Sequence, residues 1–480
     1  MRLSQLLKEL KYEGTAPEGE IGLITDDSRK VRPGCAFVCI RGKQFDGHGA
    51  AREALEAGAV CVIAEHDTGI QPQLLVENSR EAYALLCAAF FGNPAEKLTL
   101  VGVTGTNGKT TATSLLKGIF DSAGYQTGLI GTNANWVGGE EYPAALTTPD
   151  PWELHGLFAK MRDAGCTHCF MEVSSQALDQ RRVAGLRFKA GVFTNLTQDH
   201  LDYHGTFEAY VRAKKRLFSQ CDIAILNIDD EAGPFMARDS GALPVTYSLS
   251  RDNADYTAKN IALRADGVAY ELVGRGIIGR VRFGVPGAFS VYNSLAAACT
   301  ALELGLALPQ VLQVLERSSG VKGRMEVVPT GLPCTVLIDY AHSPDSLENA
   351  LRALRETTTG RLIAVFGCGG DRDKTKRPIM GRIAAEQADV IVVTSDNPRS
   401  EDPEAIIEDI LAGIPKNRAH VFVQPDRKLA IALALKKARA GDVVLLAGKG
   451  QETYQILATG KIHMDEREIV RECLMLNAKC

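Results

Sequence analysis

The sequence predicts an α/β protein of three domains, two of which are built on mostly parallel sheets. The chain has 480 residues, enough for three domains of about 150 residues each. From residue 98 onward, short apolar runs typical of buried strands alternate with helical patterns. A glycine-rich turn joins one such run to a helix at residues 105–108. We place the domains at residues 1–97, 98–325 and 326–480.

The first region mixes strand and helix patterns. Strand patterns lie at residues 35–40 and 59–64, and helical patterns at residues 48–57 and 79–91. Residues 1–10 carry charges where a signal peptide would be apolar, and they predict a short amphipathic helix. A break signal, Asn93-Pro94, follows the last helical pattern and marks the start of a linker.

The second and third regions carry the signs of parallel sheets. Strand-like runs recur in the second region at residues 98–104, 169–173, 190–195 and 223–227, with helical patterns between them. Residues 255–285 differ, since short alternating strands with glycine turns predict an antiparallel appendage. In the third region, strands at 335–339, 361–366, 390–394 and 442–447 alternate with helices at 343–356, 377–387, 403–412 and 427–440, which is typical of a doubly wound sheet.

Composition excludes several classes of protein. Apolar residues make up 45% and charged residues 23% of the chain, as in folded globular proteins rather than disordered ones. Lys and Arg number 54 against 58 Asp and Glu, and a net charge of −4 argues against a nucleic-acid partner. No apolar run approaches the roughly 18–20 residues of a membrane-spanning helix, so we expect no membrane insertion and a cytoplasmic protein.

The 12 cysteines are scattered and mostly lie within apolar runs, which predicts buried free thiols in a reducing compartment. One CxxC motif, Cys166-Thr-His-Cys169, could indicate zinc or redox chemistry. It runs into a predicted strand and has no second CxxC at metal spacing, so the interpretation as buried thiols is favoured.

The most specific motif is Gly105-Thr-Asn-Gly-Lys-Thr-Thr111, which follows an apolar strand and opens a helix. Glycines let backbone N–H groups enclose phosphate oxygens, and the helix N-terminus adds positive potential. Lys109 would reach the β- and γ-phosphates of a nucleotide, and the Thr110 hydroxyl would bind Mg²⁺. The spelling is shorter than the common GxxxxGK[ST], because Gly102 stands one residue too far from Gly108. An ordinary turn is the alternative, but the ordered strand, glycines, Lys-Thr and helix favour an ATP site in a central P-loop ATPase domain.

This loop resembles that of the Mur ligase family, ATP-dependent ligases that join amino acids to a UDP-linked muramyl peptide. Further stretches resemble the same family, in the same order, over nearly the whole chain. They are Thr147-Thr-Pro, Met171-Glu-Val-Ser-Ser, Thr194-Asn-Leu, Asp199-His200, Ala213-Lys214, Tyr292-Asn293, Gly323-Arg-Met-Glu326, Asp339-Tyr-Ala-His-Ser-Pro-Asp345 and Asp396-Asn-Pro-Arg399. One such motif is weak evidence, whereas the ordered set is specific.

The resemblance implies an ATP site with Lys109, Lys214 and Arg324 as catalytic residues. The positions that match ATP contacts are Gly105, Thr106, Asn107, Gly108, Lys109, Thr110, Thr111, Asn293, Arg324, Asp339 and His342. From the residues alone, Asp339 could equally cap a strand end.

The resemblance also implies Mg²⁺ ligands: Thr110 with Glu172, His200 for a second ion, and Lys214 after carbamylation by CO₂. Carbamylation requires the neutral amine and turns a cation into an anion that can hold Mg²⁺. From the residues alone, Glu172 could belong to a structural ion pair, and the role of His200 stays open between a structural residue and a metal ligand. Lys214 lies in a basic amphipathic helix at residues 207–218, and this pattern by itself predicts a solvated surface lysine.

The resemblance places two further groups of substrate contacts. Hydroxyls and an arginine suit phosphate and carboxylate recognition. The positions that match contacts to the UDP-linked substrate are Ser28, Lys43, Gln44, Phe45, Thr147, Thr148, Ser174, Gln180 and Arg182. Those that match contacts to the incoming amino acid are Arg372, Asp396, Asn397, Pro398, Arg399, Gly448 and Glu452.

The loop Asp396–Arg399 bears on which amino acid is added. It follows a predicted strand, at the end where parallel sheets bind ligands, and Pro398 stiffens it. The guanidinium of Arg399 would bind a carboxylate bidentately, and meso-diaminopimelate carries a second carboxylate that lysine lacks. Family members with this spelling add diaminopimelate. Glu452 and the Gly448 carbonyl would take its distal ammonium.

The implied reaction is ATP-dependent addition of meso-diaminopimelate to the D-Glu γ-carboxylate of UDP-MurNAc-L-Ala-D-Glu, through an acyl phosphate, in peptidoglycan precursor synthesis. The cofactors would be ATP and Mg²⁺, and we expect a monomer. Four alternatives stay open: an L-lysine-adding subtype, another ligase of the superfamily, a P-loop ATPase that is not a ligase, and a nucleotide-sugar-binding protein without catalysis.

Overall fold

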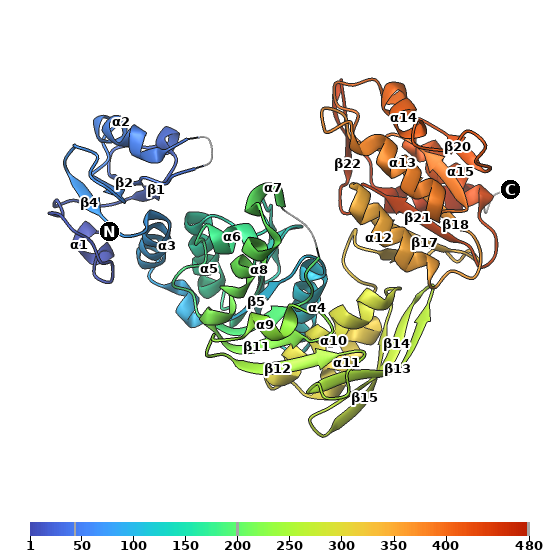
Figure 1. The fold of residues 1–480 in the computed structure, drawn as a ribbon, viewed down its shortest axis with the longest axis horizontal. Helices are drawn as coiled ribbons and strands as arrows, with labels where there is room; N and C mark the ends of the chain where they lie inside the picture. Colours follow the sequence, from blue (N-terminus) through green and yellow to red (C-terminus); the bar gives the residue numbers. More distant parts are fainter. Residues whose placement is uncertain (43–44, 198–200, 478–480) are drawn as a thin grey trace. The chain divides into compact units, whose positions relative to one another are not determined.

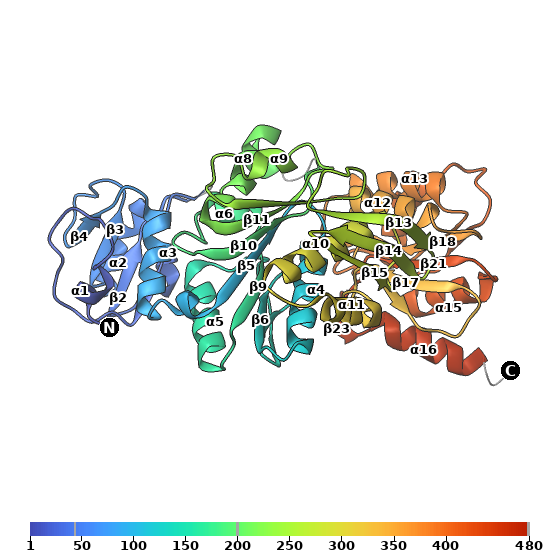
Figure 2. The same cartoon turned by 90° about the horizontal axis from the view of Figure 1, so that it is seen from below.

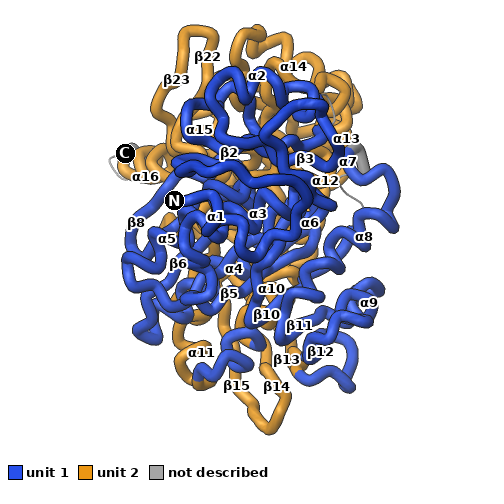
Figure 3. Tube along the Cα trace, turned by 90° about the vertical axis from the view of Figure 1, so that its left-hand side faces the viewer, with its two compact units in different colours: residues 1–255, 299–306 blue, residues 256–298, 307–480 orange. Residues whose placement is uncertain are grey.

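The structure is a computed structural model that describes residues 1–42, 45–197 and 201–477. The chain forms two compact units (Figure 3). Unit 1 comprises residues 1–255 and 299–306, and unit 2 comprises residues 256–298 and 307–480.

Unit 1 begins with a small parallel sheet whose strands lie in sequence order. They are β1 (Leu23–Thr25), β2 (Cys35–Val38), β3 (Cys61–Ala64) and β4 (Gln73–Leu75). One face packs against α1 (Leu3–Leu6) and α3 (Ser79–Phe90), and the other against α2 (Ala51–Glu56). Short 3₁₀ turns lie at η1 (Ser28–Lys30), η2 (Gly47–Ala50) and η3 (Pro94–Lys97).

The helix predicted for residues 1–10 is confirmed only for Leu3–Leu6. After Leu6 the chain forms a turn over residues 7–9, in which the Leu10 N–H donates to the Leu7 carbonyl at 3.2 Å. Further along, Glu13 exchanges two backbone hydrogen bonds with Leu75 of β4, of 2.8 and 2.9 Å.

A larger sheet forms the centre of unit 1, with strands in the order β12–β11–β10–β5–β9–β6–β7–β8. The parallel strands are β5 (Thr99–Thr104), β6 (Thr127–Ile130), β9 (His168–Glu172), β10 (Phe188–Phe193), β11 (Cys221–Asn227) and β12 (Leu243–Ser248). An antiparallel edge is formed by β7 (Asn135–Val137) and β8 (Glu140–Tyr142). Because the central strands are parallel, their carboxyl ends meet at one edge of the sheet, where such sheets bind ligands.

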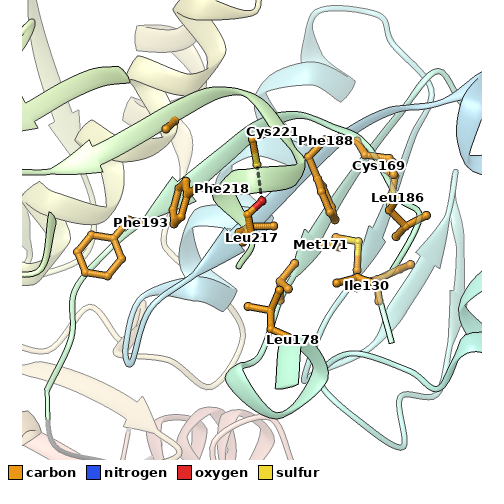
Figure 4. Packing of buried hydrophobic residues seen from close by; sticks show 14 of the residues in the cluster. Ile130, Cys169, Met171, Leu178, Leu186, Phe188, Phe193, Leu217, Phe218 and Cys221 are labelled. Carbon is orange, nitrogen blue, oxygen red and sulfur yellow. Dashed lines mark hydrogen bonds between the residues drawn. The ribbon is translucent and has the colours of Figure 1, made fainter. Parts of the chain in front are cut away.

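Helices cover both faces of this sheet. Figure 2 shows α4 and α5 on opposite sides of strands β9 and β6. The helices of this part of unit 1 are α4 (Lys109–Ser122), α5 (Pro151–Asp163), α6 (Ser175–Asp179), α7 (Leu201–His204), α8 (Phe207–Lys215) and α9 (Gly233–Met236), and a 3₁₀ turn, η4 (Phe218–Gln220), lies between α8 and α9. On the α5 side, side chains such as Met171, Phe188 and Phe218 form a continuous buried cluster (Figure 4). In this cluster the Cys221 thiol donates to the Leu217 carbonyl at 3.1 Å.

Unit 2 begins with the antiparallel appendage predicted for residues 255–285. It consists of β13 (Tyr256–Arg264), β14 (Gly267–Gly274) and β15 (Ile277–Phe283), and it confirms the prediction. The helices that follow are α10 (Ala288–Glu303) and α11 (Leu308–Arg317), of which α11 packs against β15.

The rest of unit 2 is a doubly wound sheet in the order β16–β17–β21–β18–β19–β20 (Figure 1). Its strands are β16 (Glu326–Val328), β17 (Thr335–Asp339), β18 (Leu362–Phe366), β19 (Val390–Val393), β20 (Val421–Val423) and β21 (Val443–Ala447), all parallel except β16. One face packs against α15 (Arg427–Lys437) and α16 (Glu466–Asn477). The remaining elements are α12 (Pro344–Arg355), α13 (Lys376–Gln387), α14 (Pro403–Leu411) and the hairpin of β22 (Tyr454–Leu457) and β23 (Gly460–His463). The predicted α/β class with mostly parallel sheets is confirmed.

The cysteines in the described residues are free and buried, including Cys166 and Cys169, which confirms the interpretation of the CxxC motif as buried thiols. Burial raises the pKa of Cys61 to about 12, so this thiol stays protonated. In the ranges 1–42, 45–197 and 201–477, no helix has both the length and the apolar character that crossing a membrane requires.

Candidate functional site

The glycine-rich loop lies at the carboxyl end of β5, directly before α4. Gly105 has φ +151° and Gly108 has φ +87°, conformations that favour glycine. A Cβ atom on Gly105 would lie 1.9 Å from Thr194 Oγ1, so no other residue fits there. The Thr104 hydroxyl donates to the Val173 carbonyl at 2.8 Å and ties the loop to the segment that follows β9. The predicted strand, turn and helix are confirmed.

Two lysine ammonium groups converge on one carbonyl of this loop. Lys109 Nζ donates to the carbonyls of Gly105 at 2.9 Å and Thr106 at 2.8 Å. Lys214 Nζ donates to the same Gly105 carbonyl at 2.7 Å. Two cations beside exposed backbone N–H groups make the loop strongly electropositive, which suits a phosphate chain.

The interpretation of Lys214 as a surface lysine is wrong. Its side chain is 1% exposed, because the face of α8 that carries Tyr210, Ala213 and Lys214 is the buried one. The ammonium lies 4.6 Å from the centre of the Tyr210 ring, and the Tyr210 hydroxyl lies 3.0 Å from the Thr106 hydroxyl. The basic residues of this helix therefore divide between solvent and the site.

Glu172 ends β9 beside the loop, and it is 1% exposed. Its Oε1 accepts from the Thr132 backbone N–H at 2.9 Å, and its Oε2 accepts from the Thr132 hydroxyl at 3.1 Å. Both oxygens are thus bound by Thr132, and no basic side chain forms a salt bridge with Glu172 in the part of the chain that the structure describes. A buried carboxylate that is bound by neutral donors is a candidate partner for a bound cation.

The donor set near the loop suits Mg²⁺. The Thr110 hydroxyl and the Glu172 carboxylate are hard oxygen ligands, and Mg²⁺ is usually held by one or two carboxylates together with substrate phosphates. The described residues contain no group of three or more His, Cys, Asp or Glu that could hold a metal ion. Lys214 fits such a site only as a carbamate, because its ammonium would repel the ion. His200 lies outside the described residues.

Five of the positions assigned to the UDP-linked substrate form one hydrogen-bonded group. The Thr148 hydroxyl donates to the Glu172 carbonyl at 2.9 Å and accepts from the Ser174 N–H at 3.0 Å. Arg182 donates to the Thr148 carbonyl and to Gln180 Oε1, both at 2.7 Å. The Thr147 hydroxyl lies 3.0 Å from that of Thr132, which links the group to Glu172.

Of the positions assigned to uridine, the structure describes only two. Ser28 opens the turn η1, next to an ion pair of 2.8 Å between Asp27 and Arg29. Phe45 is exposed, and Lys43 and Gln44 lie outside the described residues.

The remaining ATP positions lie in unit 2. Asp339 ends β17, and its Oδ2 accepts from the Met325 N–H at 2.7 Å, so it anchors the loop that carries Arg324. Burial raises the pKa of Asp339, and the nearby Arg324 guanidinium opposes that rise. Arg324 lies 5.1 Å from the Tyr340 ring, and its buried Nε forms no hydrogen bond within the described residues. His342 Nδ1 lies 2.7 Å from the Tyr340 carbonyl, and Asn293 is buried in α10.

A cavity of about 250 Å³ opens in unit 2, at the carboxyl ends of the parallel strands. Of the seven positions assigned to the incoming amino acid, all but Pro398 line it. The lining residues are Tyr340, His342, Gly369, Arg372, Lys376, Asp396, Asn397, Arg399, Gly448 and Glu452. Arginines and carboxylates thus share one pocket, as recognition of a zwitterionic group requires.

Arg399 is held firmly in this pocket. Its φ of +53° is in the left-handed region, which is strained for a residue with a side chain and is typical of functional positions. Its backbone N–H donates to the Ile456 carbonyl at 3.0 Å, and its guanidinium donates to the Gly370 carbonyl at 2.8 Å.

Two loops of unit 2 approach each other more closely than side chains would allow. A Cβ atom on Gly323, at φ +73°, would lie 2.1 Å from the Gln451 nitrogen. The Gly323 N–H donates to Glu326 at 2.7 Å, and Arg467 binds both Glu326 and the Gly450 carbonyl. The segment with Arg324 is therefore packed against the segment Gly448–Glu452.

The comparisons with known proteins agree with this geometry. Three family models match, described as Mur ligase middle domain (residues 103–301), Mur ligase glutamate ligase domain (323–450) and Mur ligase family catalytic domain (20–91). The chain belongs to the Mur ligase family.

Curated relatives of this Mur ligase match over its full length. One from Clostridium acetobutylicum is 46% identical and is named UDP-N-acetylmuramoyl-L-alanyl-D-glutamate–2,6-diaminopimelate ligase 1; the match covers 98% of this chain and 99% of the relative. One from Bacillus velezensis, named as the same kind of ligase, is 44% identical over 100% of both chains. A solved structure of such a ligase is 32% identical, with a TM-score of 0.76 and 99% of both chains covered. A MurF ligase from Thermotoga maritima, solved in complex with ADP, shares the fold at 21% identity and a TM-score of 0.57.

Several residues at or near the cavity of unit 2 carry no motif that would predict their place there. Lys376 lines the cavity, and its Nζ donates to the His342 carbonyl at 2.9 Å. Arg377 is fully buried, and its guanidinium donates to both oxygens of Glu401 at 2.9 and 3.0 Å. Glu401 also accepts from the Asp371 N–H at 2.5 Å and so holds the loop beside Arg372. These contacts leave no signal in the sequence, because the partners come from segments that are distant in the chain.

Stability is expected to depend on the Glu401 carboxylate in a pH-dependent way. Hydrogen bonds from Arg377 lower the pKa of Glu401 from 4.5 to about 2. A carboxylate with a lowered native pKa stabilises the fold fully above the unfolded value and loses that contribution as the pH falls toward the native value. We expect Glu401→Gln to lower the Tm by a few degrees at pH 7. Melting curves of both proteins should converge between pH 4.5 and pH 2, and a Tm difference that does not change with pH would contradict the assignment.

Proposed function

We propose that this Mur ligase adds meso-2,6-diaminopimelate to the D-Glu γ-carboxylate of UDP-MurNAc-L-Ala-D-Glu, with conversion of ATP to ADP and phosphate, in peptidoglycan precursor synthesis. The observation that carries the proposal is the pocket of unit 2, where Arg372 and Arg399 share the lining with Asp396 and Glu452. Guanidinium groups suit the distal carboxylate of diaminopimelate, and carboxylates suit its distal ammonium. Relatives 44–46% identical over nearly the whole chain carry the name of this activity.

The nucleotide would bind at the loop Gly105–Thr111. Backbone N–H groups of the loop would enclose the phosphates, and Lys109 would contact the β- and γ-phosphates. Asn293, Arg324, Asp339 and His342 are the proposed contacts from unit 2. Arg324 is the proposed donor to the transferring phosphoryl group, and its buried Nε without a hydrogen bond among the described residues supports a ligand-facing role.

We assign Mg²⁺ to Thr110 and Glu172, with Lys214 as a carbamate and His200 as the ligand of a second ion. When bound, Mg²⁺ would neutralise phosphate charge and favour phosphoryl transfer. Carbamylation of Lys214 joins its nitrogen to the carbon of CO₂ and releases two protons from the starting ammonium. The burial of Lys214 next to the Gly105 carbonyl supports this role, because it places the Lys214 nitrogen beside the loop and not in solvent.

The UDP-linked substrate would use two groups of residues. Ser28, Lys43, Gln44 and Phe45 are the proposed uridine contacts. Thr147, Thr148, Ser174, Gln180 and Arg182 are the proposed contacts to the muramyl peptide, and their shared hydrogen-bond network next to Glu172 supports the assignment.

The incoming amino acid would lie in the cavity of unit 2. Arg372 and Arg399 would bind its distal carboxylate, and Glu452 and the Gly448 carbonyl its distal ammonium. Asp396, Asn397 and Pro398 would shape the loop that presents Arg399. The reacting amine is at the other end of diaminopimelate and would point out of the pocket.

The chemistry requires two steps, because an amine cannot displace oxide from a carboxylate. In the first, an oxygen of the D-Glu γ-carboxylate attacks the γ-phosphorus of ATP, the bond to the β-phosphate oxygen breaks, and ADP leaves. In the second, the amine of diaminopimelate attacks the acyl carbon, phosphate leaves with its bonding electrons, and the amine loses a proton. Lys109 and Arg324 would stabilise the negative charge that moves during these steps.

The test is phosphate release with UDP-MurNAc-L-Ala-D-Glu, ATP and Mg²⁺, with meso-diaminopimelate, L-lysine or no amine added in parallel. Release that depends on meso-diaminopimelate is the expected result. Preference for L-lysine would keep the ligase and overturn the role given to Arg399. Equal release in all three reactions would indicate an uncoupled P-loop ATPase and would overturn the proposed function.

A further inference from the structure

A fully buried lysine lies beneath the amino-acid pocket. Lys449 is 0% exposed, and its Nζ donates to Glu452 Oε2 at 2.6 Å and to Asn397 Oδ1 at 2.7 Å. Asp396 Oδ1 lies 3.4 Å away. A buried ammonium is costly unless it is paired and hydrogen-bonded, so these partners explain how the charge is tolerated. All three partners line the pocket, whereas Lys449 itself does not.

Lys449 fixes the orientation of Glu452. Oε2 accepts from both Lys449 and Asn397 Nδ2, the latter at 3.0 Å. Oε1 accepts no hydrogen bond within the ranges that the structure describes, so one carboxylate oxygen is left for a ligand. Asn397 is itself fixed, since its Oδ1 also accepts from the Ile456 N–H at 2.9 Å.

Lys449 also sets the charge at this end of the pocket. Asp396 and Glu452 together carry two negative charges, and Lys449 offsets one of them. The remaining single negative charge matches one ligand ammonium, while Arg372 and Arg399 serve the ligand carboxylate. Without Lys449, two close carboxylates would repel that carboxylate and favour an amino acid with a cationic side chain.

We propose that Lys449 is a positioning and specificity-determining residue, which orients Glu452 and makes the pocket prefer a zwitterionic over a purely cationic distal group. This inference rests on the proposed function and adds to it a residue that does not touch the substrate.

The test is a steady-state comparison of Lys449→Met with the unmodified enzyme. We expect the KM for meso-diaminopimelate to rise about tenfold or more, because a buried charge partner is lost. The KM for ATP should stay within about twofold, and the ratio of kcat/KM for diaminopimelate to that for L-lysine should fall. Lys428→Met is the matched control, since Lys428 is exposed and pairs with Glu472 on the neighbouring helix.

A double-mutant cycle separates positioning from a structural role. If Lys449 acts through Glu452, then Lys449→Met should raise the KM for diaminopimelate much less in a Glu452→Gln background. Additive effects, or equal rises in the KM for ATP and for diaminopimelate, would overturn the proposal. Where Lys449→Met does not fold, Lys449→Arg decides: it keeps the charge but changes the geometry, and an unchanged KM for diaminopimelate and unchanged selectivity would overturn the proposal.

The two proposals fail differently. If the unmodified enzyme releases phosphate without dependence on diaminopimelate, the proposed function is wrong. If the unmodified enzyme uses diaminopimelate and Lys449→Met retains its KM and selectivity, only the role of Lys449 is wrong.

Discussion

Replacing Lys109 by alanine is expected to lower phosphate release by about 10³-fold or more, because the transferring phosphoryl group loses a preorganised cation. Lys109 Nζ is held by the carbonyls of Gly105 and Thr106, so it is already fixed over the loop before any nucleotide binds. Such preorganisation makes its contribution large, since no reorganisation is needed during the reaction. Release of phosphate in the presence of all three substrates measures the loss.

The matched control is Lys117→Ala on the same helix. Lys117 lies about two turns along α4 from Lys109 and pairs with Asp121 at 2.6 Å. Its removal should leave phosphate release nearly unchanged. A folded Lys109→Ala variant with a near-normal rate would contradict the assignment of the loop as the ATP site.

Replacing Arg399 by alanine is expected to raise the KM for meso-diaminopimelate about 10²-fold, because the distal carboxylate loses a fixed guanidinium. Arg399→Lys should recover little of the loss, since an ammonium cannot form two parallel hydrogen bonds to a carboxylate. The KM for L-lysine, which has no distal carboxylate, should change much less. The ratio of the two kcat/KM values is therefore the decisive measurement.

Arg382→Ala is the control for Arg399. Arg382 is exposed on α13 and pairs with Glu386 at 3.1 Å. It should leave both KM values unchanged. If Arg399→Ala raised the KM for diaminopimelate and for L-lysine equally, Arg399 would support the loop rather than select the carboxylate, and its hydrogen bond to Gly370 would be the reason.

The parts of the fold that sequence predicts best are those with local signals. The predicted third-region strands and helices appear as β17, α12, β18, α13, β19, α14, α15 and β21, because apolar runs and capping residues lie next to each other in the chain. The short edge strand β20, the hairpin β22–β23 and helix α16 were not predicted. β20, β22 and β23 have only three or four residues each, so none is long enough to show the pattern on which strand prediction depends.

The site residues likewise divide into those that local sequence predicts and those that it does not. Gly105, Lys109 and Arg399 stand in motifs whose chemistry can be argued from adjacent residues. Lys214 could not be placed from its own helix, because its partner Gly105 is 109 residues away. The burial of Lys449, which stands between Gly448 and Glu452, could not be predicted either, since nothing in the neighbouring sequence distinguishes a buried lysine from an exposed one. Burial of a charged side chain depends on tertiary partners, and a single sequence does not contain them.

The close approach of Gly323 to Gln451 bears on any attempt to transplant amino-acid specificity between ligases. A donor loop that replaces residues 448–452 would have to leave room for the backbone at Gly323. That backbone is so close that a Cβ atom on Gly323 would lie 2.1 Å from the Gln451 nitrogen. Grafts that carry only the specificity loop should therefore express poorly, whereas grafts that bring residues 323–326 along should be tolerated. The exchangeable part is a pair of touching segments more than a hundred residues apart, so chimeras are better cut around both than around either one.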